Sequence, residues 1–147
     1  MGRSLFGAAC LMAAIAGCSP QGSLPPSPQP LPYIAIRQPP PAGQTQILLL
    51  ARIEGRFVID DDCVRIRAGK ALVTPVFYDG TILGRDAEGV FVEDAESGLR
   101  FHDGDRFVGG GGEIASDHIG KLTLASGSIP EACQGDLGTL NPGMQHH

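Results

Sequence analysis

The sequence predicts a small all-β domain, and three observations lead to this prediction. Of its 147 residues, 21 are glycine and 12 are proline while none is tryptophan, a composition typical of short strands and turns. Several segments alternate apolar and polar residues with a period of two, as half-buried strands do. No segment of useful length shows the helical period. We therefore expect a small closed β barrel, which removes exposed strand edges, with a small β sandwich as the alternative.

The expected strands follow one another with short turns between them. An apolar run at 47–50 opens the domain, and residues 53–59 then alternate apolar with charged side chains. Asp79-Gly80 and Asp103-Gly104 are dipeptides that favour type I′ hairpin turns, in which both central residues have positive φ. Further strands are expected at 63–67, 72–78, 90–93, 99–102, 106–108 and 121–124.

The first 17 residues have the features of an export signal. Arg3 supplies a positive charge, and residues 5–16 form an apolar run. The run is too short to span the roughly 30 Å hydrocarbon layer of a membrane as a helix. It ends in Ile15-Ala16-Gly17-Cys18, which resembles the lipobox of bacterial lipoprotein precursors. That resemblance implies cleavage before Cys18 and attachment of fatty acyl chains, such as palmitate, to this cysteine. The alternative is an ordinary secretory peptide in which Cys18 is incidental.

Residues 18–46 are predicted to be a lipidated cysteine followed by a disordered linker. Nine of the twelve prolines fall in this segment, and proline favours extended, solvated chain. At about 3.1 Å per residue, such a linker would reach roughly 85 Å from the membrane. Residues 33–36 form a short apolar island within it. The sequence leaves open whether this island docks on the domain or adds an edge strand.

The remaining cysteines predict one disulfide bond. Cys10 leaves with the leader and Cys18 carries lipid, so Cys63 and Cys133 remain as an even pair in an exported chain. A metal pair or a reactive thiol is the alternative, but the chain has no CxxC motif and no histidine at close ligand spacing. In the loop-entropy treatment, a bridge across this separation stabilises the fold by roughly 4 kcal/mol.

Residues 103–113 resemble part of a group of small exported bacterial proteins, many of them lipoproteins. In that group a glycine before a short strand, a cysteine-bearing strand, a Gly-Asp segment, a GGGE-like run and a late cysteine recur on an OB-like β barrel. The similarity covers residues 55–133 and implies an OB-like barrel, which we place at 47–138 with a flexible tail at 139–147. It departs at Thr74-Pro75-Val76, where many of these proteins have a tryptophan-proline pair. The group has no assigned reaction, so the resemblance implies no site residues.

The chain offers few candidates for chemistry. Glycines 109–112 could cradle an anion, but they lack the Lys-Ser/Thr pair of a phosphate loop, and a bulge or tight strand crossing is the favoured interpretation. Ser116-Asp117-His118 has the residue types of a hydrolase triad without a GxSxG elbow. His102, Asp103 and Asp105, or the aspartates at 60–62, could bind a metal, yet both sets coincide with expected turns. We predict no catalytic residues, no metal and no cofactor.

These observations favour a non-catalytic cell-envelope lipoprotein that binds or scaffolds a partner protein or glycan near a membrane. The alternative is a metal-dependent hydrolase or an enzyme accessory subunit. The formal net charge of −5 argues against nucleic acid as a partner. Ser19 after the lipidated cysteine resembles the pattern of lipoproteins sent to the outer membrane. In a cell with two membranes, we therefore expect the periplasmic face of the outer membrane.

Overall fold

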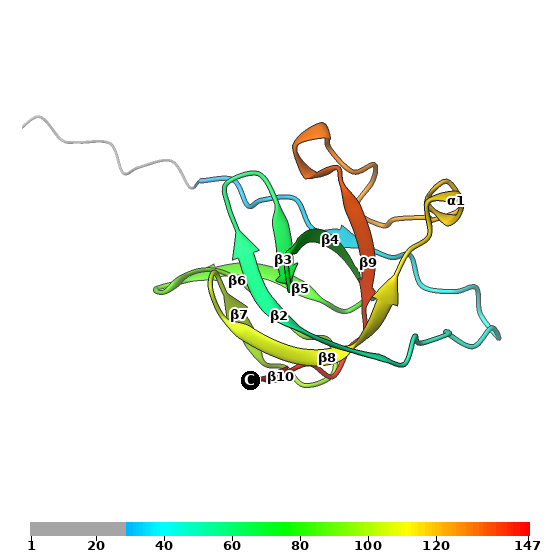
Figure 1. Ribbon diagram of the computed structural model, residues 1–147, viewed down its shortest axis with the longest axis horizontal. Helices are drawn as coiled ribbons and strands as arrows, with labels where there is room; N and C mark the ends of the chain where they lie inside the picture. Colours follow the sequence, from blue (N-terminus) through cyan, green and yellow to red (C-terminus); the bar gives the residue numbers. More distant parts are fainter. Residues whose placement is uncertain (1–28) are drawn as a thin grey trace, which may run out of the picture.

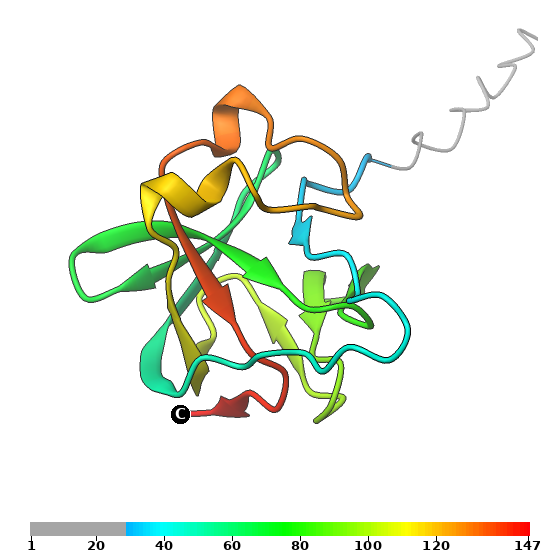
Figure 2. The ribbon, with the colours of Figure 1, turned by 90° about the vertical axis from the view of Figure 1, so that its right-hand side faces the viewer.

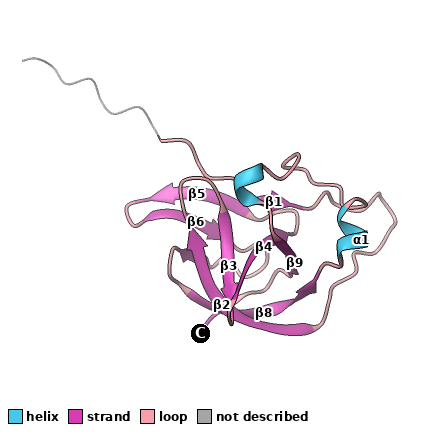
Figure 3. Ribbon diagram, turned by 45° about the horizontal axis from the view of Figure 1, so that its top comes forward, coloured by secondary structure: helices cyan, strands magenta, loops and turns pink. Residues whose placement is uncertain are grey.

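The computed structural model describes residues 29–147 and consists almost entirely of strands (Figure 1). A one-turn helix and a 3-10 segment are the helical parts of this range, and both lie outside the ring of strands (Figure 3). The elements are β1 (Ala35–Ile36), β2 (Ala51–Ile59), β3 (Val64–Ala68), β4 (Ala71–Phe77), β5 (Ile82–Asp86), β6 (Gly89–Glu93), β7 (Arg100–His102), β8 (Arg106–Glu113), α1 (Ser116–Ile119), the 3-10 segment Glu131–Cys133, β9 (Asp136–Leu140) and β10 (Gln145–His146).

Five of these strands close into a barrel in the order β2-β3-β4-β9-β8, and β8 returns to β2. All neighbours are antiparallel except β4 and β9, which run parallel. Figure 1 shows the five strands surrounding the centre of the molecule. The expected OB-like barrel is therefore confirmed, and the sandwich alternative does not form. Closure gives every barrel strand a partner along part of each of its two edges.

A second sheet, β5-β6-β7, closes one end of the barrel. Its Val92 and Phe101 belong to the same buried cluster as Phe57, Phe77 and Phe107 of the barrel strands. Phe57 stacks on Phe101 with ring centroids 5.1 Å apart. In Figure 2 this sheet and the β3–β4 hairpin lie at opposite ends of the barrel. The aromatic core is therefore concentrated at the covered end.

The glycine run 109–112 forms half of β8, at the point where this strand leaves β2 and pairs with β9. A Cβ atom on Gly111 would lie 2.2 Å from the Thr139 carbonyl oxygen and 2.7 Å from the Ile53 side chain. No real Cβ fits at those distances, so glycine is required there. The structure thus confirms the tight strand crossing that the sequence favoured over an anion cradle.

The Cys63–Cys133 disulfide is also confirmed. It joins the residue before β3 to the 3-10 segment that precedes β9. Next to it, the Thr74 hydroxyl donates a hydrogen bond of 2.7 Å to the Cys133 carbonyl. The bridge therefore ties the long connection between β8 and β9 to the barrel wall.

The predicted linker is wrong at residues 33–36, because these residues belong to the domain. Ala35 and Ile36 form β1, which adds to β4 in parallel, and Ile34 and Ala35 are buried. The Tyr33 amide donates to the Asp62 carbonyl and fixes the entry of this segment. Apolar burial and pairing outweigh the surrounding prolines here. Residues 33–36 therefore both dock on the domain and add a strand to it.

The boundaries at 47 and 139 also need correction. Residues 47–50 are not in a strand and stay exposed, with Leu50 92% exposed, because β2 begins only at Ala51. At the other end, β9 continues to Leu140 and β10 pairs with β8, so 139–147 is not a free tail. Met144 is 1% exposed and packs in the core. The expected strand at 121–124 is a loop with one bridge, between Arg37 and Leu124.

The two predicted type I′ hairpins are also wrong. Gly80 and Gly104 have positive φ, but among the described residues no other residue type does, so the aspartates before them do not meet the type I′ requirement. Both turns lie where the chain passes from one sheet to the other, between β4 and β5 and between β7 and β8. A type I′ turn would return the chain along its own partner strand. A turn in which only the glycine has positive φ instead lets the chain continue into a strand of the other sheet.

Candidate ligand-binding surface

Cys18, the predicted lipidation site, lies outside the described residues. The predicted signal peptide 1–17 and the first part of the linker lie outside them as well. Within residues 29–147, no helix is long and apolar enough to cross a membrane. The described residues that could form a functional site belong to the barrel, its covering sheet and the loops around them.

The aspartates at 60–62 form a turn cap. The Asp60 carboxylate accepts hydrogen bonds from the amides of Asp62 and Cys63, at 3.0 and 2.8 Å, and pairs with Arg65. Partial burial acts to raise the pKa of Asp60, but these hydrogen bonds and the nearby guanidinium outweigh it and lower the pKa. The carboxylate of Asp60 is therefore committed to the turn and to β3.

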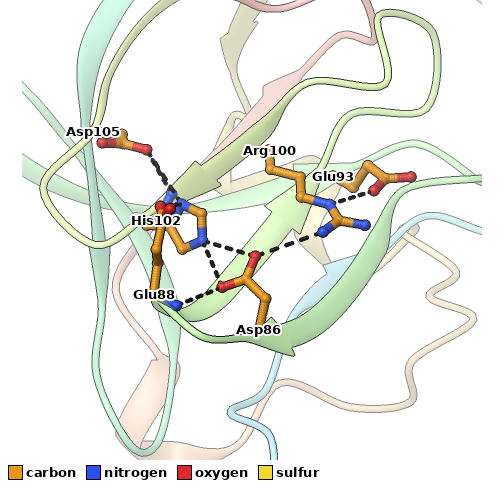
Figure 4. Close-up of polar contacts among 6 residues, drawn as sticks. All are labelled: Asp86, Glu88, Glu93, Arg100, His102 and Asp105. Carbon is orange, nitrogen blue, oxygen red and sulfur yellow. Dashed lines mark hydrogen bonds and ion pairs between the residues drawn. The ribbon is translucent and has the colours of Figure 1, made fainter.

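The carboxylates of Asp103 and Asp105 likewise serve the backbone, and the His102 ring faces a neighbouring acid. The Asp103 carboxylate accepts the Ile59 amide at 2.9 Å, and the Asp105 carboxylate accepts the His102 amide at 2.8 Å. The His102 ring faces Asp86, with Nε2 lying 3.1 Å from Oδ1 (Figure 4). In the described part of the chain, no three His, Cys, Asp or Glu side chains form a group that could hold a metal ion.

Figure 4 shows that the outer face of β5–β7 carries a paired charge network. Arg100 donates to Glu93 at 2.8 Å and lies 3.6 Å from Asp86, and its guanidinium stacks 4.2 Å from the centre of the Phe91 ring. The hydrogen bond to Glu93, which is its largest influence, raises the pKa of Arg100. Desolvation acts to raise the pKa of Asp86, but hydrogen bonds from the Glu88 amide and from His102 lower it overall. The charged groups at the centre of this network are thus already partnered.

Ser116, Asp117 and His118 fall in α1, which has only four residues. Consecutive residues on a helix point about 100° apart and do not face one another. A hydrolase triad needs the side chains of a nucleophile, its base and an orienting group to converge, and the side chains of Ser116 and Asp117 lie outside the described part of the structure. The helix therefore gives no support to a hydrolase triad at this position.

A feature that the sequence analysis missed is a row of three arginines on neighbouring barrel strands. In the strand register, Arg56 of β2 lies directly opposite Arg67 of β3 on one side and Arg106 of β8 on the other. All three are exposed on the outer face of the barrel. We call Arg56, Arg67 and Arg106 the arginine row. The only sequence signal was their outward position in alternating segments, which cannot show that they align.

The arginine row has no counter-charge of its own. Within residues 29–147 these three guanidinium groups make no ion pair and no side-chain hydrogen bond. They border a hollow of about 610 Å³ that Glu54 and His147 also line. Glu54 is engaged elsewhere, because it accepts a hydrogen bond of 2.7 Å from Arg52. The row is therefore a cationic surface available to an anion.

Neighbouring strands lie about 4.8 Å apart, so the row spans roughly 10 Å from Arg67 to Arg106. Guanidinium groups bind carboxylate, phosphate and sulfate through paired N–H donors, and three in line suit several anionic groups on one ligand. Comparisons of this chain with protein-family models, with curated proteins and with solved structures found no match.

Proposed function

We propose that this protein is a membrane-anchored lipoprotein of the cell envelope whose barrel is a non-catalytic binding module. The arginine row is the surface that binds, and its ligand is an anionic glycan or an acidic protein segment of the envelope. The proposal joins two lines of support. The lipobox-like motif ending in Cys18 supports the anchor, and the unpartnered arginines support the binding role.

The observation that carries the binding role is the absence of a counter-charge where it would stabilise the sheet. Like charges directly opposite one another on adjacent strands destabilise a sheet by about 0.2–1 kcal/mol per pair. The row contains two such pairs, Arg67–Arg56 and Arg56–Arg106. The chain as a whole carries five more acidic than basic charges, so acidic residues are not scarce. A bound anion would relieve this repulsion and explain why the row stays unpaired.

The anchor places this surface near a membrane. Because Tyr33 is fixed to the domain, the tether consists of residues 19–32 and reaches about 43 Å when extended at about 3.1 Å per residue. This is half the length expected from the sequence alone. The binding surface would therefore operate close to the bilayer, at the periplasmic face of the outer membrane in a cell with two membranes.

Binding to a defined polyanion tests the role of the row. Dextran sulfate and neutral dextran are titrated against the full protein in neutral detergent micelles, by calorimetry at low and at physiological salt. We expect only dextran sulfate to bind, and more weakly as salt rises, because screening shortens the reach of exposed charges. Substituting Arg56, Arg67 and Arg106 together by glutamine should weaken binding about 10- to 100-fold, taking 0.5–1 kcal/mol per exposed contact.

A charge-matched variant separates the row from net charge. Lys70→Gln, Arg85→Gln and Lys121→Gln together remove the same three positive charges from exposed positions outside the row. This variant should keep at least most of the affinity. Equal losses in both variants would mean that binding follows net charge alone, and the role of the row would be rejected.

The anchor is tested separately. Mass spectrometry of the mature protein should find acyl chains on an amino-terminal Cys18, and the Cys18→Ala protein should show neither cleavage at this site nor acylation. Mature protein that starts elsewhere, or that carries no lipid, would refute the anchor and leave the binding role of the row standing.

A further inference from the structure

The end of the barrel opposite the β5–β7 sheet opens into a pocket of about 400 Å³. All five barrel strands contribute to its lining. We call this pocket the barrel mouth. Its apolar wall consists of Ile53, Ile66, Ala68, Ala71, Val73 and Leu137.

The mouth is open because small residues line the strands that form it. Ala68 and Ala71 lie opposite each other next to the β3–β4 turn, and Gly112 and Gly138 stand where β8 and β9 meet. The phenylalanines that fill the barrel belong to its other end. Pockets of this size with mainly apolar walls and a few polar groups are the usual form of small ligand sites, and barrel mouths are one of their usual places.

The rim of the mouth carries two carboxylates without a counter-charge. Glu113 ends β8 and Asp136 begins β9, and both are exposed. Glu113 pairs in register with Gly138, two residues along β9 from Asp136, so the two acids sit diagonally across neighbouring strands. Within the described chain neither makes an ion pair or a side-chain hydrogen bond. The third acid of the rim, Glu54, is paired with Arg52.

Apolar walls below two free carboxylates define the chemistry of a matching ligand. The walls favour an unbranched hydrocarbon stem, whose burial contributes about 0.8 kcal/mol per methylene. The rim favours a positive charge at the end of that stem, near water. Lysine has this form, with four methylenes and a terminal ammonium group.

We infer that the barrel mouth is a second binding site, which takes a lysine side chain from an extended segment of a partner protein. The stem lies along Ile53, Ile66 and Val73, and the ammonium group sits between Glu113 and Asp136. This site shares only Glu54 with the hollow beside the arginine row, and its two free carboxylates carry the opposite charge. A partner with a basic segment would therefore use the mouth and leave the row to an anionic ligand.

Short peptides test the inference on the full protein in neutral detergent micelles. Acetyl-Ala-Lys-Ala-amide is titrated while amide chemical shifts are followed by NMR, beside the norleucine and glutamate analogues and free pentylamine. We expect the lysine peptide to shift resonances of the mouth and to bind about tenfold more tightly than the norleucine peptide, because only lysine reaches the carboxylates. The glutamate peptide should not bind.

Variants of the mouth should weaken the lysine peptide selectively. Glu113→Gln with Asp136→Asn should reduce its affinity about tenfold, towards that of the norleucine peptide, while Asp79→Asn with Glu96→Gln removes the same charge elsewhere and should change little. Ala71→Leu fills the mouth at an exposed position and should weaken both peptides. Glutamine at all three positions of the arginine row should leave lysine binding unchanged, so the two proposals fail independently.

Three results would overturn the inference. The first is equal binding of the lysine and norleucine peptides, and the second is an equal loss in the charge-matched control. The third is pentylamine that binds as tightly as the peptide, because the site would then recognise a free amine and not a partner segment.

Discussion

Two faces of the molecule treat their charges in opposite ways. On the outer face of β5–β7, Arg100 and Asp86 lie among partners within 4 Å, and Arg100 also covers an aromatic ring. On the outer face of β2, β3 and β8, the arginine row has like charges as its nearest neighbours in register. Both faces belong to β-sheets of the same domain. The difference shows which charges hold the fold together and which are left available.

The position of the β5–β7 sheet in the fold explains why the charges on its outer face are paired. The strands of the β5–β7 sheet have only three to five residues, and β5 and β7 have no further strand beside them. Short edge strands gain little from backbone pairing, so cross-strand side-chain pairs matter more to them. The barrel strands are paired on both sides by closure and do not need such contacts. They can therefore carry an unpaired row without losing the fold.

The largest expected effect concerns a buried acid at the paired face. Asp94, between β6 and β7, is 3% exposed and accepts hydrogen bonds from the amides of Glu96, Ser97 and Gly143. Asp94→Ala should lower the free energy of unfolding by about 3 kcal/mol, because three backbone amides lose their buried carboxylate acceptor. Urea denaturation measures this change. Asp94→Asn keeps one acceptor oxygen and should lose less; an alanine variant as stable as the parent would show that this clamp does not hold the C-terminal segment.

A smaller effect of opposite sign is expected in the arginine row. Arg56→Gln removes the central charge and both like-charge pairs, so it should raise the free energy of unfolding by about 0.5 kcal/mol. The gain should shrink in high salt, where exposed charges are screened. Arg52→Gln breaks the contact with Glu54 on the same strand and should give no gain. Destabilisation by Arg56→Gln would mean that the row serves the fold, and the contrast between the two faces would be lost.

Side-chain alternation made much of this architecture predictable. Residues 64–67 alternate inward and outward as expected, with Val64 and Ile66 buried. The β9 strand was not predicted from the sequence. Four of its five residues, from Leu137 to Leu140, are buried in succession, so it has no period of two. Residues 121–124 alternate apolar and polar side chains with a period of two, yet they form a loop. Only Leu124 among them takes part in a β bridge, with Arg37.

The sites were harder to predict than the strands. The disulfide was accessible because only two cysteines remained to pair. The arginine row depends on the registers of β2 with β3 and of β2 with β8, and a shift of one residue would move these side chains to other faces. The barrel mouth depends on β4 lying parallel to β9, a contact between segments about 60 residues apart. Neither alignment follows from local pattern.

The smallest expected effect is a pH dependence that separates the two faces. The pKa of Asp86 is lowered in the folded protein, so its charged form stabilises the fold above its ordinary value near 3.8. This contribution is lost as the pH falls below 3.8 and through the lowered folded-state value.

Asp86→Asn should therefore lower the Tm slightly at pH 7, and its difference from the parent should vanish as Asp86 becomes protonated at low pH. Arg56→Gln should keep its small gain across the same range, because both like-charge pairs that it removes are formed by arginines and involve no carboxylate. Melting curves of both variants and of Asp79→Asn, a control at a turn, measure the contrast. An Asp86→Asn difference that does not change between pH 7 and pH 2.5 would show that its carboxylate adds nothing to the paired face.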